Sequence, residues 1–158
     1  MRKIILSGSL VLLLAGALWW WLRPNHPAPV NASIYETDMM EALVRGVLPE
    51  FQPSPAVCFL AFGEGTTPPS STFIARFAGT QPVVRSCDHA AMPPVGRQFE
   101  ISTGKPGCLI HVIQFREITP DAFDVLVRFS HLPEGHDQFG YRVTKFAGDW
   151  SIADRKPM

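Results

Sequence analysis

The sequence shows no excess of either charge and none of the common catalytic motifs. Fourteen basic residues stand against fourteen acidic ones, so the formal net charge is +0. No basic stripe is present, which argues against nucleic-acid binding. A GxSxG elbow, a CxxC pair and a phosphate-binding P-loop are also missing. We therefore expect a protein that is not an enzyme and that carries no cofactor.

Cysteine is scarce, at three residues. Cys58 lies in the apolar run VCFLAF, whereas Cys87 ends one expected strand and Cys108 begins another. Closing the loop between the last two would stabilise the fold by roughly 3 kcal/mol in the chain-entropy model. In an oxidising compartment we predict a Cys87–Cys108 disulfide. The alternative is that all three thiols are reduced and buried as small hydrophobes.

One long uncharged run is present, at residues 4–22. A helix needs roughly 20 apolar residues to cross the hydrocarbon core of a bilayer, so this run is just long enough. Three tryptophans near its end suit the membrane–water interface: Trp19, Trp20 and Trp21. We predict that residues 1–23 form an N-terminal anchor that contacts the lipid bilayer.

The charges that flank this run predict its orientation. Arg2 and Lys3 precede it, which favours a cytoplasmic N-terminus and transfer of the remaining chain across the membrane. In a bacterium this gives a single-pass inner-membrane protein with a periplasmic C-terminal domain. The alternative is a cleaved signal peptide, because Ala15-Gly16-Ala17 suits cleavage after Ala17.

The rest of the chain reads as a spacer followed by one domain. Residues 24–32 are rich in proline and should be semi-extended, and residues 33–158 are enough for a single exported domain with a core. All fourteen acidic residues but only eleven of the fourteen basic ones follow Arg23, a net charge of about −3. Ser33 and Glu36 have the spacing of a capping box and predict a helix that ends near Val47. Its expected apolar face is Met39, Met40, Leu43, Val44 and Val47.

Short elements follow, punctuated by proline and glycine. We expect a strand at 56–62, a short helix at 71–79 capped by Ser70 or Ser71, and a strand at 82–87. The expected strands of the C-terminal half are 97–102 with Phe99 and Ile101 inward, 108–116, 122–130, and a hairpin of 141–146 with 150–153. The pattern predicts an α+β fold: one or two helices packed on a meandering, mostly antiparallel sheet of about five to seven strands.

The closing stretch GYRVTKFAGDWSIAD resembles the last two strands of nuclear-transport-factor-two-like (cystatin-like) domains. In that family a strand with a tyrosine, a tight glycine turn and a tryptophan strand finish a curved sheet. The middle, VCFLAFG followed by SSTFIARF, resembles uncharacterised exported bacterial proteins with one N-terminal anchor. The chain departs from the first family by placing a strand and a short helix after its first helix. The resemblance implies a fold and no substrate.

Two groups of side chains are candidates for chemistry. The segment HLPEGHDQ supplies possible zinc or copper ligands, and His89 could join them from another loop. Its spacing, however, matches no compact metal motif. Its candidates are His131, Glu134, His136 and Asp137. Cys87 and His89 would share one side of an extended chain, where a histidine can activate a thiolate, although the disulfide competes.

His111 is the third candidate. It is expected on one strand face with Leu109, Ile113 and Phe115, either as a tuned base lining a pocket or as a core histidine held by one hydrogen bond.

These observations leave two functional hypotheses. The first is a membrane-tethered, non-catalytic interaction module or accessory subunit that binds a membrane or envelope protein through its exported domain, with exposed aromatics such as Phe139. The second is a small-ligand-binding or enzymatic domain with a pocket between helix and curved sheet, lined by His111 or the 131–137 loop. A buried, closed His111 would favour the first.

Overall fold

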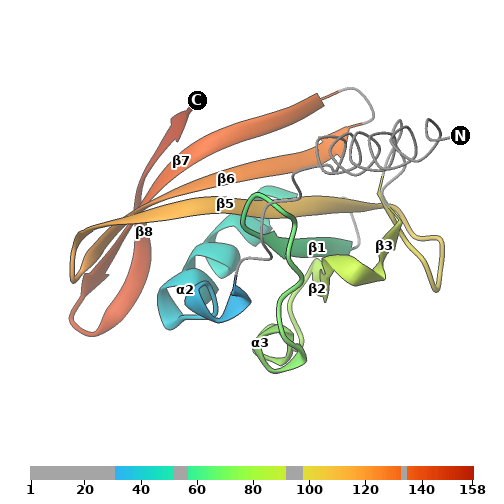
Figure 1. Cartoon of the computed structure of the whole chain (residues 1–158), viewed down its shortest axis with the longest axis horizontal. Helices are drawn as coiled ribbons and strands as arrows, with labels where there is room; N and C mark the ends of the chain where they lie inside the picture. Colours follow the sequence, from blue (N-terminus) through green and yellow to red (C-terminus); the bar gives the residue numbers. More distant parts are fainter. Residues whose placement is uncertain (1–30, 52–56, 92–97, 133–134) are drawn as a thin grey trace, which may run out of the picture.

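The computed structural model describes residues 31–51, 57–91, 98–132 and 135–158, with the side chains of 131–136 left aside. The predicted anchor, with Trp19, Trp20 and Trp21, and nearly all of the spacer lie outside these ranges. Within them, no helix has the length and apolar character needed to cross a bilayer. The described chain is an α+β domain with one main helix and a mostly antiparallel six-stranded sheet, which confirms the predicted class (Figure 1).

The sheet has the order β2-β1-β5-β6-β7-β8, and a separate pair β3-β4 lies beside it. The strands of the sheet are β1 (Val57–Phe62), β2 (Val83–Ser86), β5 (Gly107–Thr119), β6 (Ala122–Leu132), β7 (Gly135–Phe146) and β8 (Asp149–Pro157). The small pair consists of β3 (Ala90–Ala91) and β4 (Phe99–Glu100). The six strands of the main sheet were all expected and are mostly right in place, but β7 and β8 are longer than expected and β3 was not predicted.

The first two strands are parallel, which the sequence did not predict. β1 pairs in parallel with β2 on one side and with β5 on the other. The chain passes from β1 to β2 through α3 (Ser71–Ala75), because parallel neighbours require a crossover connection. Every residue of β1 is buried, as expected of a parallel strand covered on both faces. β1 is thus the most enclosed element of the sheet.

The other strands form an antiparallel meander with two different faces. In β6, Val125, Val127 and Phe129 are buried in the main core. Their neighbours Leu126 and Arg128 are only partly buried on the opposite face. This alternation confirms the predicted faces of β6 and follows from the two-residue period of a strand.

Helix α2 (Asp38–Val47) covers one face of the meander and contacts β7 and β8 (Figure 1). All five apolar residues predicted for its buried face are buried. Its start differs from the prediction: Thr37 is the N-cap, and its side chain accepts from the backbone N of Met40 at 3.2 Å. Ser33 lies instead in a 3-10 turn, η1 (Ala32–Ile34). Glu36 does not complete a capping box, because its carboxylate accepts from Ser70, from the backbone N at 2.6 Å and from Oγ at 2.7 Å.

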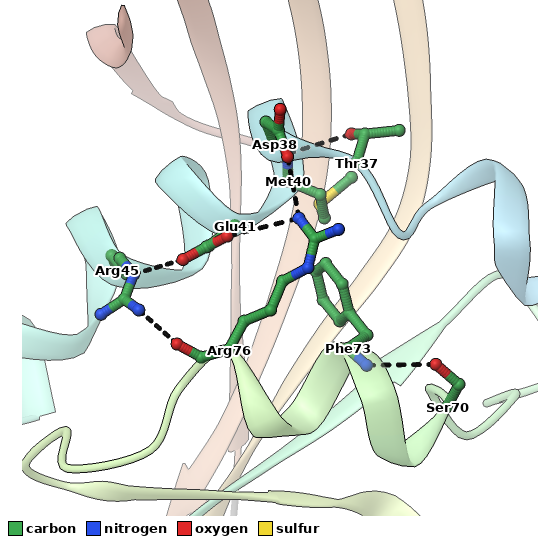
Figure 2. Close-up of polar contacts among 8 residues, drawn as sticks. All are labelled: Thr37, Asp38, Met40, Glu41, Arg45, Ser70, Phe73 and Arg76. Carbon is green, nitrogen blue, oxygen red and sulfur yellow. Dashed lines mark hydrogen bonds and ion pairs between the residues drawn. The ribbon is translucent and has the colours of Figure 1, made fainter.

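Charged side chains join α2 to α3 (Figure 2). Arg76 reaches Asp38 at 2.8 Å and Glu41 at 3.4 Å, while Arg45 binds Glu41 and also donates to the backbone carbonyl of Arg76. Ser70 caps α3 by accepting from the backbone N of Phe73 at 3.1 Å, as predicted. Since Phe73 and Phe77 belong to the same core cluster as α2, both helices cover the same face of the sheet.

The prediction for residues 97–102 is wrong. Only Phe99 and Glu100 form a strand, and it is Glu100 that is buried, whereas Phe99 and Ile101 are exposed. The physical cause is a turn that begins at Ile101. Thr103 folds back to donate from Oγ1 to the Glu100 carboxylate at 2.5 Å, and Arg85 donates to it at 3.4 Å. A polar pairing therefore overrides the apolar pattern.

Candidate functional site

A row of alternating charges crosses the face of the meander that α2 and α3 leave uncovered. Four register partners on four strands form this row, which we call the charged row: Arg116, Asp124, Arg142 and Asp154. Opposite charges directly across neighbouring strands stabilise a sheet. The sequence could not show this row, because its members are brought together by strand register.

Asp124 is the centre of the charged row. Arg142 donates to its two carboxylate oxygens from Nε at 2.8 Å and from Nη2 at 3.0 Å, and Arg116 donates at 3.3 Å. These bonds, with that from Arg142 the strongest, lower the pKa of Asp124 and keep it ionised. The same contact raises the pKa of Arg142. The two-point pairing with Arg142 fixes the geometry of this face.

A shallow hollow of about 410 Å³ lies along the charged row. Leu126 and Gly140 are register partners beside the row and line it. Gly140 leaves room there, since a Cβ added to it would meet only the Met158 sulfur, at 3.6 Å. Lys156, the register partner of Gly140 on β8, adds a third cation. The hollow thus offers a small apolar floor inside a polar rim, as protein interfaces do.

A second hollow, of about 510 Å³, lies between α3, β2 and β4. It is lined by Arg85, Ser86, His89 and Glu100, among others. Ser86 Oγ is buried and has no hydrogen-bond partner in the part of the chain that the structure describes. Because an unpaired buried hydroxyl is unfavourable, it is suited to binding a polar molecule.

His111 is a core histidine. Only 5 % of its surface is exposed, and its Nε2 lies 2.5 Å from the carbonyl oxygen of Gly63, to which the neutral ring donates. Burial lowers its pKa, which favours the neutral form. Phe115 does not share its face as predicted, because a bulge between Val112 and Gln114 reverses the alternation of β5.

The predicted Cys87–Cys108 disulfide is not present. All three cysteines are free, and the sulfur next to Cys108 belongs to Cys58, at 2.9 Å. Cys87 instead donates to the carbonyl oxygen of Thr66 at 3.4 Å. It lies in a 3-10 turn, η3 (Cys87–His89), and not at the end of an extended strand. Its side chain packs in a second, smaller buried cluster with Phe59 and Leu109, whereas Cys108 belongs to the main core cluster.

The turn also separates Cys87 from His89. Cys87 is buried, while the His89 side chain is 63 % exposed, so they do not share a side as predicted for an extended chain. Burial, with a smaller effect of Asp88, raises the pKa of Cys87 to about 11. A thiol of this kind is protonated at neutral pH and is a poor nucleophile.

The candidate metal ligands fall mostly outside the described part of the molecule. Glu134 is not described, nor are the side chains of His131 and His136, at the β6–β7 hairpin. Asp137 is exposed on β7. Among the described side chains, no group of three histidine, cysteine or carboxylate residues is placed to hold a metal ion.

Phe139 is not an exposed aromatic, contrary to the prediction. That side chain is partly buried on β7, 5.9 Å from the ring of Phe129, and the guanidinium of Arg155 lies 3.8 Å above it. Phe146, at the β7–β8 turn, is instead 83 % exposed. Ala147 and Gly148 form that turn with positive φ angles of 53° and 99°, a two-residue hairpin that is one residue shorter than expected, because Asp149 pairs with Phe146.

Serine and lysine at a Ser-x-x-Lys spacing, Ser102 and Lys105, lie on the exposed turn after β4. That turn offers no helix to position the pair, as the hydrolases that use this spacing require.

Comparison with known proteins does not assign this chain to a family, because no family model, no curated protein and no solved structure matches it. The function has to be inferred from the residues of the domain itself.

Proposed function

We propose that this protein is a membrane-tethered, periplasmic interaction module, an accessory subunit that binds an envelope or membrane protein without catalysing a reaction. The observation that carries the proposal is the uncovered face of β5–β8 with its charged row. Neither catalytic candidate gains support, since His111 is closed in the core and Cys87 is a protonated, buried thiol. The anchor predicted at residues 4–22 would hold this face close to the membrane.

The chemistry of the face favours an acidic polypeptide segment as the partner. Arg116, Arg142 and Lys156 outnumber Asp124 and Asp154 along the hollow. Arg116 pairs with Asp124 and Lys156 with Asp154, each at 3.3 Å, but their side chains are 77 % and 74 % exposed, so both cations can also contact a second molecule. Complementary charges of this kind set orientation and specificity more than affinity.

Co-purification of the full-length, C-terminally tagged chain from membranes in mild detergent tests the proposal. We expect one membrane protein to be recovered in stoichiometric amount with the wild type and to be lost with Arg116→Glu/Lys156→Glu. The matched control Lys105→Glu changes a charge on the turn after β4 and should retain it. Equal recovery with both variants would contradict the assignment of this face.

The intact mass of the recovered chain tests the tether. Retention of residues 1–22 is expected, and a chain processed after Ala17 that leaves the membrane fraction would contradict it.

The second hollow supports a different candidate function, the binding of a small polar ligand. Its supporting observation is the buried hydroxyl of Ser86 beside Arg85, for which the described residues supply no hydrogen-bond partner. Amide NMR titration with a set of small carboxylates would show shifts confined to β2, α3 and β4 if this function holds. Such shifts should be lost in Ser86→Ala, and their absence from the wild type would exclude this ligand class.

A further inference from the structure

Cys58 and Cys108 face one another at the junction between the parallel and the antiparallel parts of the sheet. They are register partners on β1 and β5. Both are fully buried in the main core cluster, and their sulfurs are 2.9 Å apart. This arrangement was not expected from the sequence, where Cys58 looked like one buried residue in an apolar strand.

The backbone geometry at this position suits a covalent bond. Neighbouring strands lie roughly 4.7–4.9 Å apart, and disulfides join Cα atoms roughly 4.4–6.8 Å apart. Both side chains point to the same face, because both belong to the core cluster that α2 and α3 cover. A bond between them therefore needs no rearrangement of the strands.

We propose that Cys58 and Cys108 form a structural disulfide that fastens β1 to β5 when the chain folds in an oxidising compartment. Cys87 stays as the free thiol, since its sulfur donates to the Thr66 carbonyl oxygen and its side chain lies in the second buried cluster, not in the one that holds Cys58 and Cys108. The inference depends on export of the domain and not on the identity of any binding partner.

The oxidant is a disulfide, that of an exported thiol–disulfide oxidoreductase or, in vitro, of oxidised glutathione. The Cys108 thiolate attacks one sulfur of that disulfide and expels the other as a thiolate. The Cys58 thiolate then attacks Cys108 in the mixed disulfide, forms the Cys58–Cys108 bond and releases the second thiolate of the oxidant. Two cysteine thiols lose two protons and two electrons, and the oxidant gains two thiols.

The exchange has to occur before the core closes. The hydrogen bond with Cys58, together with burial, raises the pKa of Cys108 strongly, so the folded core holds no reactive thiolate. Once formed, the bond is equally inaccessible to reductants. The folded, oxidised protein should resist a reductant that acts only from solvent.

Thiol counting tests the proposal. The reduced full-length chain is refolded with oxidised glutathione, then denatured without reductant and alkylated with N-ethylmaleimide. One labelled thiol, at Cys87, is expected, with peptide mapping showing a link between Cys58 and Cys108. Three labelled thiols, or a link that contains Cys87, would overturn the proposal.

Two further samples control for folding and for location. Cys87→Ser should still form the bond, whereas Cys58→Ser should leave two thiols to label. Oxidised wild type should unfold roughly 10–20 °C above the reduced wild type, because the bond closes a loop of about 50 residues. Equal unfolding temperatures would contradict a structural bond.

A chain isolated from an exporting host should already carry the Cys58–Cys108 bond. Three labelled thiols in that sample would show that the bond does not form where the protein folds, and would overturn the proposal.

Discussion

The two halves of the sheet differ in how many of their faces are buried. Around β1, both faces are covered: Cys58, Leu60 and Phe62 enter the main core, while Phe59 and Ala61 form a second cluster on the other side. In the second half of β5 and in β6 to β8, the described helices cover only one face, and the other carries charges in register. The comparison indicates that the parallel half is the more enclosed part of the sheet, while the antiparallel half exposes the face for which we propose binding.

The largest expected difference between the halves is in the stability lost when an apolar side chain is truncated to alanine. Phe59 is fully buried on the second face of β1, so Phe59→Ala should lower the free energy of unfolding by about 3–5 kcal/mol. Leu126→Ala, on the uncovered face, should lower it by about 1 kcal/mol or less. Chemical denaturation measures both. Similar losses for the two variants would remove the distinction between the halves.

Two glycines provide the next comparison. A Cβ at Gly107 on β5 would lie 2.4 Å from Phe59 Cε2 and 2.9 Å from the Val57 carbonyl oxygen. Gly107→Ala should therefore cost about 1–3 kcal/mol through overpacking. Gly140→Ala on β7 has free space and should change stability by no more than about 0.5 kcal/mol. Thermal unfolding of both variants checks this, and a tolerated Gly107→Ala would mean that β1 and β5 are packed less tightly than described.

Near neutral pH, the pH dependence of stability should come from His111, which is buried in the enclosed part of the sheet. Burial holds the pKa of His111 below its ordinary value, so the unfolded state takes up the proton first as pH falls. Stability should be complete above the unfolded pKa, about 6.5, and should decline as pH drops from there towards 5. His111→Gln should flatten this decline and the exposed-site control His89→Gln should not. An unchanged slope in His111→Gln would contradict the assignment.

The smallest effect is expected on the charged row. Asp124→Asn weakens the pairing to Arg116 and Arg142 but leaves the core intact, so it should cost about 1 kcal/mol or less. The cost should shrink in high salt, because exposed charges are screened. Asp149→Asn, at the β7–β8 turn, is the control. A large loss of unfolding free energy in Asp124→Asn that does not depend on salt would mean that the charged row holds the fold together, contrary to this account.

The sequence predicted those elements that local pattern determines. Alternation in β6, helical spacing in α2, the Ser70 cap and the β7–β8 turn were all visible from the chain and are confirmed. The parallel pairing of β1 was not visible, since a continuous apolar run shows burial on both faces but not the direction of its neighbours.

The errors at the site have the same origin. A bulge in β5 separates Phe115 from His111, and a 3-10 turn separates Cys87 from His89. Both are short irregularities that leave no mark in a periodic pattern. The Cys58–Cys108 contact and the charged row depend on the register between neighbouring strands, which a single sequence does not reveal.

Photo-crosslinking in membranes tests the central claim most directly, namely that the uncovered face of β5–β8 binds an envelope protein. A photoreactive residue at Gln114, exposed on that face, should give one discrete crosslinked product, and the product should disappear when Arg116→Glu/Lys156→Glu is added. The same probe at Thr72, exposed on α3, should give none. Crosslinks from Thr72 but not from Gln114, or a Gln114 product that survives the charge reversal, would contradict the account.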